Sequence, residues 1–392
     1  GTNLDGEDLG MSSGIHITAS GGTSPPNLIV GNRIAYNSRG IYVLGSGGFI
    51  RRNRITDNNT GVDFNGPGQL GSQDIADANV IGNNGTGVWV FSSGNGLVAI
   101  RNNYIGTDAS GASLGNVGGV SVYGADSRVW IGYGGGGNVI VNNTSHGINL
   151  RQGASDVMIA GDLVGLHSNG QPMGNKVGIV FGNAPASNAT GNQVGYKLSD
   201  VINPATWLPG NGNGNVIAHN DKAISFAWAD DNSTGNVIRG NSIYSNGPAG
   251  TRGIDLGMDE LDIGGAASGP NKLMNYPDFD AAATEYDAGA AEINYRVRVQ
   301  TTPANADYPL TIDFYLTDGS SPQGKTFIGS MVYPISAAFE FRTGTLSVNQ
   351  PVDTSTYLVA TATDASGNTS QFSNQPWRLI TPEDAIFSDR FE

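Results

Sequence analysis

The chain repeats a short pattern of apolar and polar positions from about residue 27 to residue 260. In residues 27–44, Ile29, Ile34 and Ile41 mark three short apolar segments separated by Gly, Asn and Ser. Such segments are typical of strands joined by tight turns. A second copy follows about 21 residues later, a spacing typical of a repeat architecture. The pattern therefore predicts repeated units of short β-strands.

Each unit contains a strand of the form Gly-[Ile/Val]-x-[Val/Leu/Phe]. Alternation places the two branched or aromatic residues on one face and the intervening residue on the other. A strand with two buried positions cannot be stable alone, so successive units must stack and share a core. The motif recurs at Gly40, Gly61, Gly87, Gly119, Gly147, Gly178 and Gly253. These features predict a right-handed parallel β-helix of about ten coils, with asparagine ladders at its corners.

The pattern changes after about residue 275 to longer alternating strands. Their turns predict an antiparallel β-sandwich. The strands are expected at 292–301, 310–316, 326–333, 339–348, 356–363 and 371–380. We expect an all-β chain in four parts: a β-helix at 1–265, a junction at 266–280, the sandwich at 281–380 and a tail at 381–392. Residues 183–214 are rich in proline and turns, which predicts a long insertion projecting from the coils.

The composition argues against several classes of function. The chain has 392 residues, 59 of them glycine, and a net charge of −14 at pH 7. The acidic balance argues against a nucleic-acid partner. The absence of cysteine excludes disulfides and thiolate chemistry. No run of about 18 apolar residues is present, so we expect no membrane span.

Chemistry is expected on the outward face of the repeated strand, whose side chains form two ladders. The first is Tyr42, Asp63, Trp89, Ser121, Asn149, Val180, Ser225 and Asp255, and the second is Leu44, Asn65, Phe91, Tyr123, Arg151, Gly182, Ala227 and Gly257. Aromatic rings interspersed with hydrogen-bonding groups suit sugar rings. We expect a substrate surface formed by Tyr42, Asp63, Asn65, Trp89, Phe91, Tyr123, Asn149 and Arg151. The alternative is that loops cover these rings as a second apolar layer.

A catalytic alternative uses Asp63, His146 and Arg151. Proton abstraction from an acidic sugar needs a base and a cation that stabilises the enolate, and this set supplies both. His146 as a solvated corner residue is the simpler interpretation. The arginines at 33, 51, 52, 54 and 101 form a basic strip on another face, which suits either an anionic glycan or neighbouring acids.

Neither the glycan-binding hypothesis nor the catalytic one requires a cofactor. Calcium is the one candidate ion. Asp255, Asp259 and Asp262, with Glu260 beside them, offer the oxygen ligands that calcium prefers, although their spacing follows no specific loop pattern. The other histidines share no metal-ligand spacing.

The repeats resemble bacterial secreted right-handed β-helix proteins of the pectate-lyase-like superfamily. The segment at 105–116, IGTDASGASLGN, is similar to a repeat of large surface proteins, and it recurs in related form at 164–175. Residues 253–277 resemble the junction by which such helices join a C-terminal domain. Residues 361–373 are similar to the closing hairpin of bacterial immunoglobulin-like domains. The resemblance implies an extracellular or cell-surface location.

These observations favour a secreted or surface protein that binds a polysaccharide or cell-surface glycan across its aromatic sheet face. Two alternatives remain. The first is a polysaccharide lyase or glycoside hydrolase acting on an acidic glycan, although the motifs of the pectin hydrolases and pectate lyases are absent. The second is a structural or adhesin arm, which requires no site at all.

Overall fold

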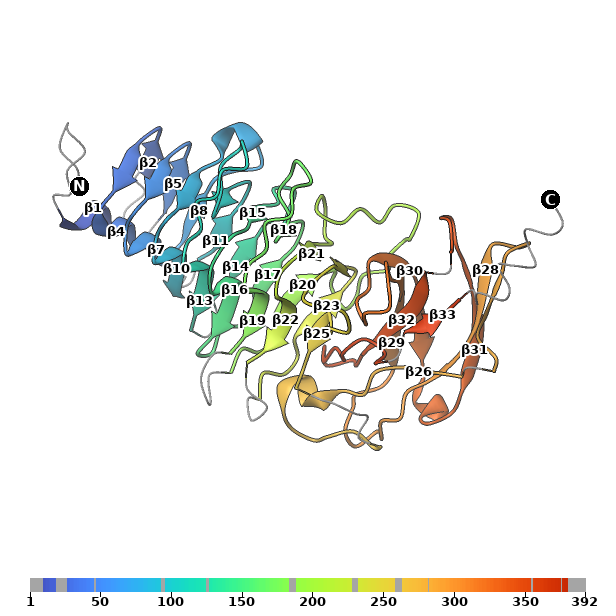
Figure 1. Ribbon diagram of the computed structural model, residues 1–392. Helices are drawn as coiled ribbons and strands as arrows, with labels where there is room; N and C mark the ends of the chain where they lie inside the picture. The colour runs from blue at the N-terminus through green and yellow to red at the C-terminus, as the bar shows by residue number, and fades with distance from the viewer. Residues whose placement is uncertain are drawn as a thin grey trace, which may run out of the picture.

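The chain forms a stack of parallel coils followed by a small antiparallel domain (Figure 1). The computed structural model describes residues 10–18, 27–45, 47–92, 96–124, 127–182, 188–227, 232–257, 263–280, 282–353, 355–374 and 376–379. In the described chain, helix is confined to three short 3-10 turns: η1 (Ile75–Asp77), η2 (Pro270–Leu273) and η3 (Ile335–Ala337). The predicted all-β class is confirmed.

Three parallel sheets run along the coil stack. The first sheet contains β1 (Met11–Thr18), β4 (Asn37–Leu44), β7 (Thr60–Asn65), β10 (Thr86–Ser92), β13 (Gly118–Tyr123), β16 (His146–Arg151), β19 (Val177–Phe181), β22 (Lys222–Phe226) and β25 (Ile254–Asp255). The second contains β2 (Asn27–Val30), β5 (Gly48–Arg51), β8 (Gly68–Leu70), β11 (Val98–Ile100), β14 (Val129–Ile131), β17 (Val157–Ile159), β20 (Gln193–Gly195) and β23 (Val237–Arg239). The third contains β3 (Arg33–Ala35), β6 (Arg54–Thr56), β9 (Val80–Gly82), β12 (Tyr104–Ile105), β15 (Val139–Ile140), β18 (Leu163–Val164), β21 (Val216–Ala218) and β24 (Ser242–Tyr244).

Each coil contributes apolar side chains from all three sheets to one core. Ile29, Ile34 and Ile41, the three positions of the repeat, are all buried there. The repeat glycine allows adjacent coils to approach closely, since a Cβ on Gly61 would lie 2.5 Å from the carbonyl oxygen of Gly87. The parallel β-helix predicted from the repeat is therefore confirmed.

Asparagine ladders join the coils at their corners, as predicted. In one ladder, Asn84 Nδ2 donates to Asn116 Oδ1 at 3.0 Å and to two backbone carbonyls, and Asn84 Oδ1 accepts two bonds from Asn58. Its members are Asn37, Asn58, Asn84, Asn116, Asn143, Asn175, Asn220 and Asn246. The ladder satisfies corner amides that would otherwise be buried without partners.

The C-terminal domain has two antiparallel sheets. One contains β26 (Asp278–Phe279), β27 (Glu285–Asp287), β28 (Glu292–Arg298) and β31 (Arg342–Ser347), and the other contains β29 (Leu310–Leu316), β30 (Thr326–Tyr333), β32 (Tyr357–Thr363) and β33 (Trp377–Arg378). The strands at 310–316 and 326–333 coincide with their predicted bounds, whereas the strand expected at 371–380 is only the short β33. The immunoglobulin-like assignment remains a prediction.

The antiparallel domain packs on the last coils (Figure 1). Arg239 on β23 and Asp313 on β29 form a bidentate ion pair, with Nε to Oδ2 at 2.7 Å and Nη2 to Oδ1 at 2.9 Å. Both side chains are almost fully buried. The Tyr315 hydroxyl accepts a bond from the Gly240 amide at 2.8 Å. The two units therefore share a buried interface.

Gln323 of the C-terminal domain supplies the last rung of the first asparagine ladder. Its Oε1 accepts bonds of 3.1 Å from both the backbone amide and the Nδ2 of Asn246. Its Nε2 donates to the carbonyl oxygens of Asn246 and Thr251. A glutamine thus occupies the place that the asparagine of another coil would take.

The prediction of a long insertion at 183–214 is wrong in part. Residues 193–195 form β20, which pairs with β17 and β23 as a regular member of the second sheet. Trp207 packs against the core, and its Nε1 donates to the carbonyl oxygen of Gly240 at 2.8 Å. Proline and turn residues lengthen this coil on both sides of β20. The apolar pattern therefore did not identify its short central strand. In the described chain, no helix has the length and apolar character needed to cross a bilayer.

Candidate functional site

The outward face of the first sheet carries the predicted first ladder in register. Tyr42 pairs with Asp63, Asp63 with Trp89, and Trp89 with Ser121 across successive strands. The ladder continues through Asn149, Val180, Ser225 and Asp255. The first ladder is confirmed over its whole length.

The second ladder is interrupted at Phe91. A register shift between Val90 and Ser92 places Ser92, rather than Phe91, opposite Asn65. Beyond the shift, Tyr123 and Arg151 pair as predicted. The irregularity leaves Phe91 55% exposed, so its ring projects at the edge of the sheet face.

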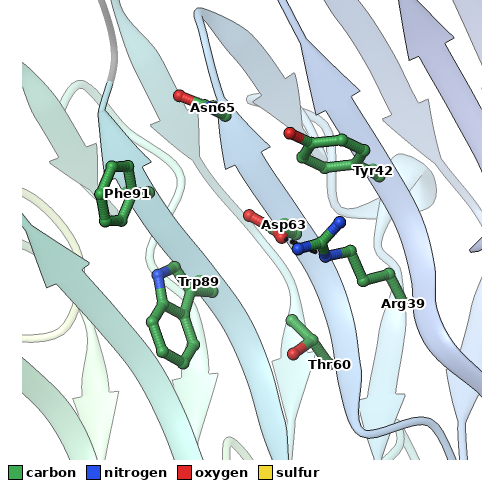
Figure 2. A pocket seen from close by; sticks show the side chains of 7 residues that line it. All are labelled: Arg39, Tyr42, Thr60, Asp63, Asn65, Trp89 and Phe91. Carbon is green, nitrogen blue, oxygen red and sulfur yellow. Dashed lines mark ion pairs between the residues drawn. The ribbon is translucent and has the colours of Figure 1, made fainter. Parts of the chain in front are cut away.

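A pocket of about 320 Å³ opens on this face. Figure 2 shows Asp63 between Tyr42 and Trp89. Asn65 and Phe91 lie toward the C-terminal ends of β7 and β10. The lining residues are Arg39, Tyr42, Thr60, Asp63, Asn65, Trp89 and Phe91. Three aromatic rings therefore surround one carboxylate, one amide and one guanidinium.

Asp63 and Arg39 form the charged centre of this pocket. Arg39 Nε lies 2.8 Å from Asp63 Oδ2 (Figure 2), and the guanidinium also stacks 4.5 Å from the centre of the Tyr42 ring. Burial raises the pKa of Asp63, and the charge of Arg39 partly opposes that rise. The Asp63 side chain is only 13% exposed, whereas Arg39 is 47% exposed. The pair holds Asp63 in place and leaves Arg39 accessible to a ligand.

Trp89, Tyr123 and Arg151 form a stack along three strands. The Trp89 and Tyr123 ring centres are 4.5 Å apart and the rings are parallel within 1°. The Arg151 guanidinium lies 4.1 Å from the centre of the Tyr123 ring. Tyr123 is 4% exposed, so its faces are covered and it supports Trp89 rather than offering a free ring.

His146 lies further along the same face. Its Nε2 is 3.0 Å from Ser121 Oγ, and its Nδ1 is 3.2 Å from Ser145 Oγ. Burial lowers the pKa of His146 to about 4, so the imidazole is neutral at physiological pH. A serine and a neutral histidine in contact are the elements of nucleophilic catalysis. Ser121 is only 3% exposed, however, and its hydroxyl is closed to a substrate.

Asp63, His146 and Arg151 do not meet in one site. Asp63 on β7 is three strands from β16, roughly 14 Å at the usual strand spacing. His146 and Arg151 occupy opposite ends of β16, a separation on the order of 16 Å. A base and a cation cannot act on the same sugar carbon across these distances.

The predicted calcium group cannot be assembled from the described residues. Asp255 forms an ion pair with Lys222 at 3.6 Å. Asp259, Glu260 and Asp262 lie outside the described residues. In the described ranges, no three His, Asp or Glu side chains are grouped to hold a metal ion.

The basic strip is largely balanced by acids. Arg51 and Arg52 both contact Asp77, at 3.2 and 3.8 Å, and Arg54 contacts Asp108 at 3.8 Å. The strip therefore has the character of a solvated, charge-paired face.

Arg39 and Thr60 were missed by the sequence interpretation. Both directly precede a repeat glycine, as His146 does, and they pair with each other across β4 and β7. Strict alternation predicts outward residues two positions apart. The closely packed glycine breaks this rule, so Arg39 and Tyr42 both face outward although they are three positions apart. The residue before the repeat glycine recurs in every unit, and this recurrence could have identified Arg39 and Thr60 as outward-facing residues.

The chain was compared with protein families and with curated proteins. Residues 2–125 match the family model described as "Periplasmic copper-binding protein (NosD)". No curated protein matches the chain significantly. The matched part covers the first coils and the whole pocket, but less than half of the chain.

A copper site does not fit the described residues of the matched part. Residues 2–125 contain one histidine, His16, one methionine, Met11, and no cysteine, whereas copper favours clustered imidazole and sulfur ligands. The His16 ring stacks on Tyr42 with centres 4.8 Å apart. The likeness to the family is therefore a likeness of the coil scaffold, and we derive no copper chemistry from it.

Proposed function

We propose that this chain is a carbohydrate-binding β-helix protein that acts outside the cytoplasm, with a polysaccharide lying across the first sheet. The pocket between Tyr42, Trp89 and Phe91 carries this proposal. Aromatic rings stack on the apolar faces of sugars while neighbouring polar groups bond their hydroxyls. The match to a family described as periplasmic supports the location.

The pocket favours binding over cleavage. Glycoside hydrolysis needs two carboxyl groups roughly 5 to 9.5 Å apart. Among the described lining residues, Asp63 is the only carboxyl group, and Arg39 already pairs with it. A lyase or hydrolase therefore has weaker support than a binding protein. A bare structural arm would not account for three rings gathered around a polar centre.

Trp89 is the residue to test. We expect Trp89→Ala to weaken glycan binding at least tenfold, because central aromatic residues dominate binding energies. Trp130→Ala is the matched control, since Trp130 is also half-buried but lies on the second sheet. Binding is measured on a glycan array and then by titration calorimetry. Equal binding by wild type and Trp89→Ala would overturn the proposal.

Catalysis is tested separately with polyuronides and neutral glycans. Product formation is followed through the absorbance of unsaturated ends and through new reducing ends. We expect neither signal. Turnover of any substrate that is abolished by Asp63→Asn would replace the binding assignment with an enzymatic one.

A further inference from the structure

Arg151, at the end of β16, has no counter-ion among the residues that the structure describes. Within the described residues, no carboxylate forms an ion pair with Arg151, and its Nε is buried without a hydrogen-bond partner. Arg39 on the same sheet differs, since it contacts Asp63 at 2.8 Å. The two arginines of this face are thus in different electrostatic states.

An unpaired guanidinium at a partly buried position is unfavourable. Burial lowers the pKa of Arg151, which reflects the loss of water around the charge. Proteins usually compensate such a charge with a carboxylate or with several hydrogen bonds. Stacking on Tyr123 recovers part of this cost but satisfies none of the N–H groups.

Two further polar atoms beside Arg151 are buried without partners. They are Oη of Tyr123 and Oδ1 of Asn149. Tyr123 is 4% exposed and Asn149 is 2% exposed. Buried polar atoms almost always have partners, so the polar groups around Arg151 on the adjacent strands β13 and β16 are incompletely satisfied within the described chain. Arg151 Nε and Tyr123 Oη are donors, which suit an anion, whereas Asn149 Oδ1 is an acceptor, which suits a sugar hydroxyl.

This place is continuous with the pocket. Trp89 lines the pocket and stacks on the opposite face of Tyr123 from Arg151. From β10 to β16 there are two strand spacings, roughly 9.6 Å. A glycan seated at Trp89 that runs along the coil stack therefore passes over Arg151.

We propose that Arg151 forms an anion subsite, held in place by Tyr123, which binds a carboxylate or sulfate group on the glycan seated at Trp89. This inference rests on the proposed function and names its ligand class. A guanidinium binds such groups through two parallel N–H bonds. The net charge of −14 disfavours non-specific polyanion binding, so an anionic glycan depends on this local cation.

The test compares oligogalacturonates with their methyl-esterified forms, which have the same sugar rings but no charge. We expect wild type to bind the acidic form at least tenfold more tightly, since hydrogen bonds between charged groups are worth this factor or more. Arg151→Gln removes the preference. Arg128→Gln preserves it, because Arg128 is an exposed arginine beside the second sheet. Dextran sulfate and inorganic sulfate are tested alongside.

The outcomes separate the two proposals. Trp89-dependent binding of both forms with equal affinity overturns the anion subsite and leaves glycan binding intact. A preference that survives in Arg151→Gln also overturns the subsite. Arg151-dependent binding of dextran sulfate alone supports the subsite and identifies the group as a sulfate. Binding of inorganic sulfate without any glycan overturns its assignment to a polysaccharide. No binding of any glycan overturns the proposed function itself.

Discussion

Asp162 Oδ1 accepts two hydrogen bonds from Asn138, one from the backbone amide at 2.7 Å and one from Nδ2 at 2.8 Å. Asp162 occupies a rung that asparagine fills in the neighbouring coils, where the side-chain Nδ2 donates to the next rung and to carbonyl oxygens, as Asn103 does. Its Oδ2 is buried and has no partner. Burial raises the pKa of Asp162 to about 7, so the folded protein retains this proton in mildly acidic solution.

The first prediction concerns the pH dependence of stability. The unfolded chain loses the Asp162 proton near pH 4, whereas the folded protein loses it near pH 7. The free energy of unfolding therefore falls as pH rises through this window, by on the order of 4 kcal/mol. Asp162→Asn removes this dependence and is more stable than wild type at pH 8. Urea unfolding at pH 4.5 and pH 8 measures the difference.

Asp156→Asn is the control, since it removes an aspartate of the same coil that is 65% exposed and directly precedes β17. We expect its pH profile to follow that of wild type. Parallel profiles for wild type and Asp162→Asn would contradict the assignment of the buried proton.

The second prediction concerns the asparagine ladder. Asn84→Ala removes three donated and two accepted bonds and leaves buried partners unsatisfied. We expect a loss of about 3 kcal/mol or more, because each unsatisfied buried group costs about 1–3 kcal/mol. Asn59→Ala, at an exposed corner of the preceding coil, should change stability by less than about 0.5 kcal/mol. Equal effects in thermal unfolding would refute the role of the ladder.

The third prediction concerns the interface between the coils and the antiparallel domain. Asp313→Asn leaves the Arg239 guanidinium buried without a counter-ion, so we expect destabilisation of about 3–5 kcal/mol. Limited proteolysis should then cleave between the two units. Arg239→Met combined with Asp313→Leu should recover much of the loss, since two well-packed apolar side chains can replace a buried pair.

Lys325→Gln provides the comparison for this interface. It breaks a partly exposed ion pair with Asp318 at 3.3 Å, which is worth less than about 1 kcal/mol. A loss from Asp313→Asn no larger than that from Lys325→Gln would show that the buried pair does not secure the interface.

The fourth prediction concerns the charged centre of the pocket. The Arg39 charge partly opposes the rise in the Asp63 pKa that burial causes. Arg39→Gln should therefore raise the Asp63 pKa further above that in wild type, as measured by carboxyl-carbon NMR titration. Arg33→Gln removes a charge on the third sheet and should leave the Asp63 titration unchanged. An unaltered Asp63 pKa in Arg39→Gln would rule out the coupling.

Much of the fold could be predicted from the sequence because the constraint is local and repeated. Alternation around Gly40 and Gly61 identified the buried face and the order of the outward ladder, and the Asn corners indicated the ladders.

The site could be predicted only in part because it depends on departures from the repeat. The shift beside Val90 moved Phe91 out of its ladder, and the packed glycine brought Arg39 into the pocket. The stacking that covers Tyr123 depends on rotamers of Trp89 and Arg151, which no spacing rule specifies. His146 and Arg151 lie on one strand. They stand at its two ends, however, and the ends of a six-residue strand are too far apart for both side chains to act on one sugar carbon.

Gln323 also determines how such molecules can associate. A parallel coil stack that ends in free backbone and asparagine groups is a template onto which another stack can grow, as in fibrous assemblies. By bonding Asn246 through both its amide oxygen and its nitrogen, Gln323 occupies the growing point of one ladder with a residue that has no following rung. At this end of the ladder, Asn246 therefore has no free amide group to which the corner of a further coil could bond.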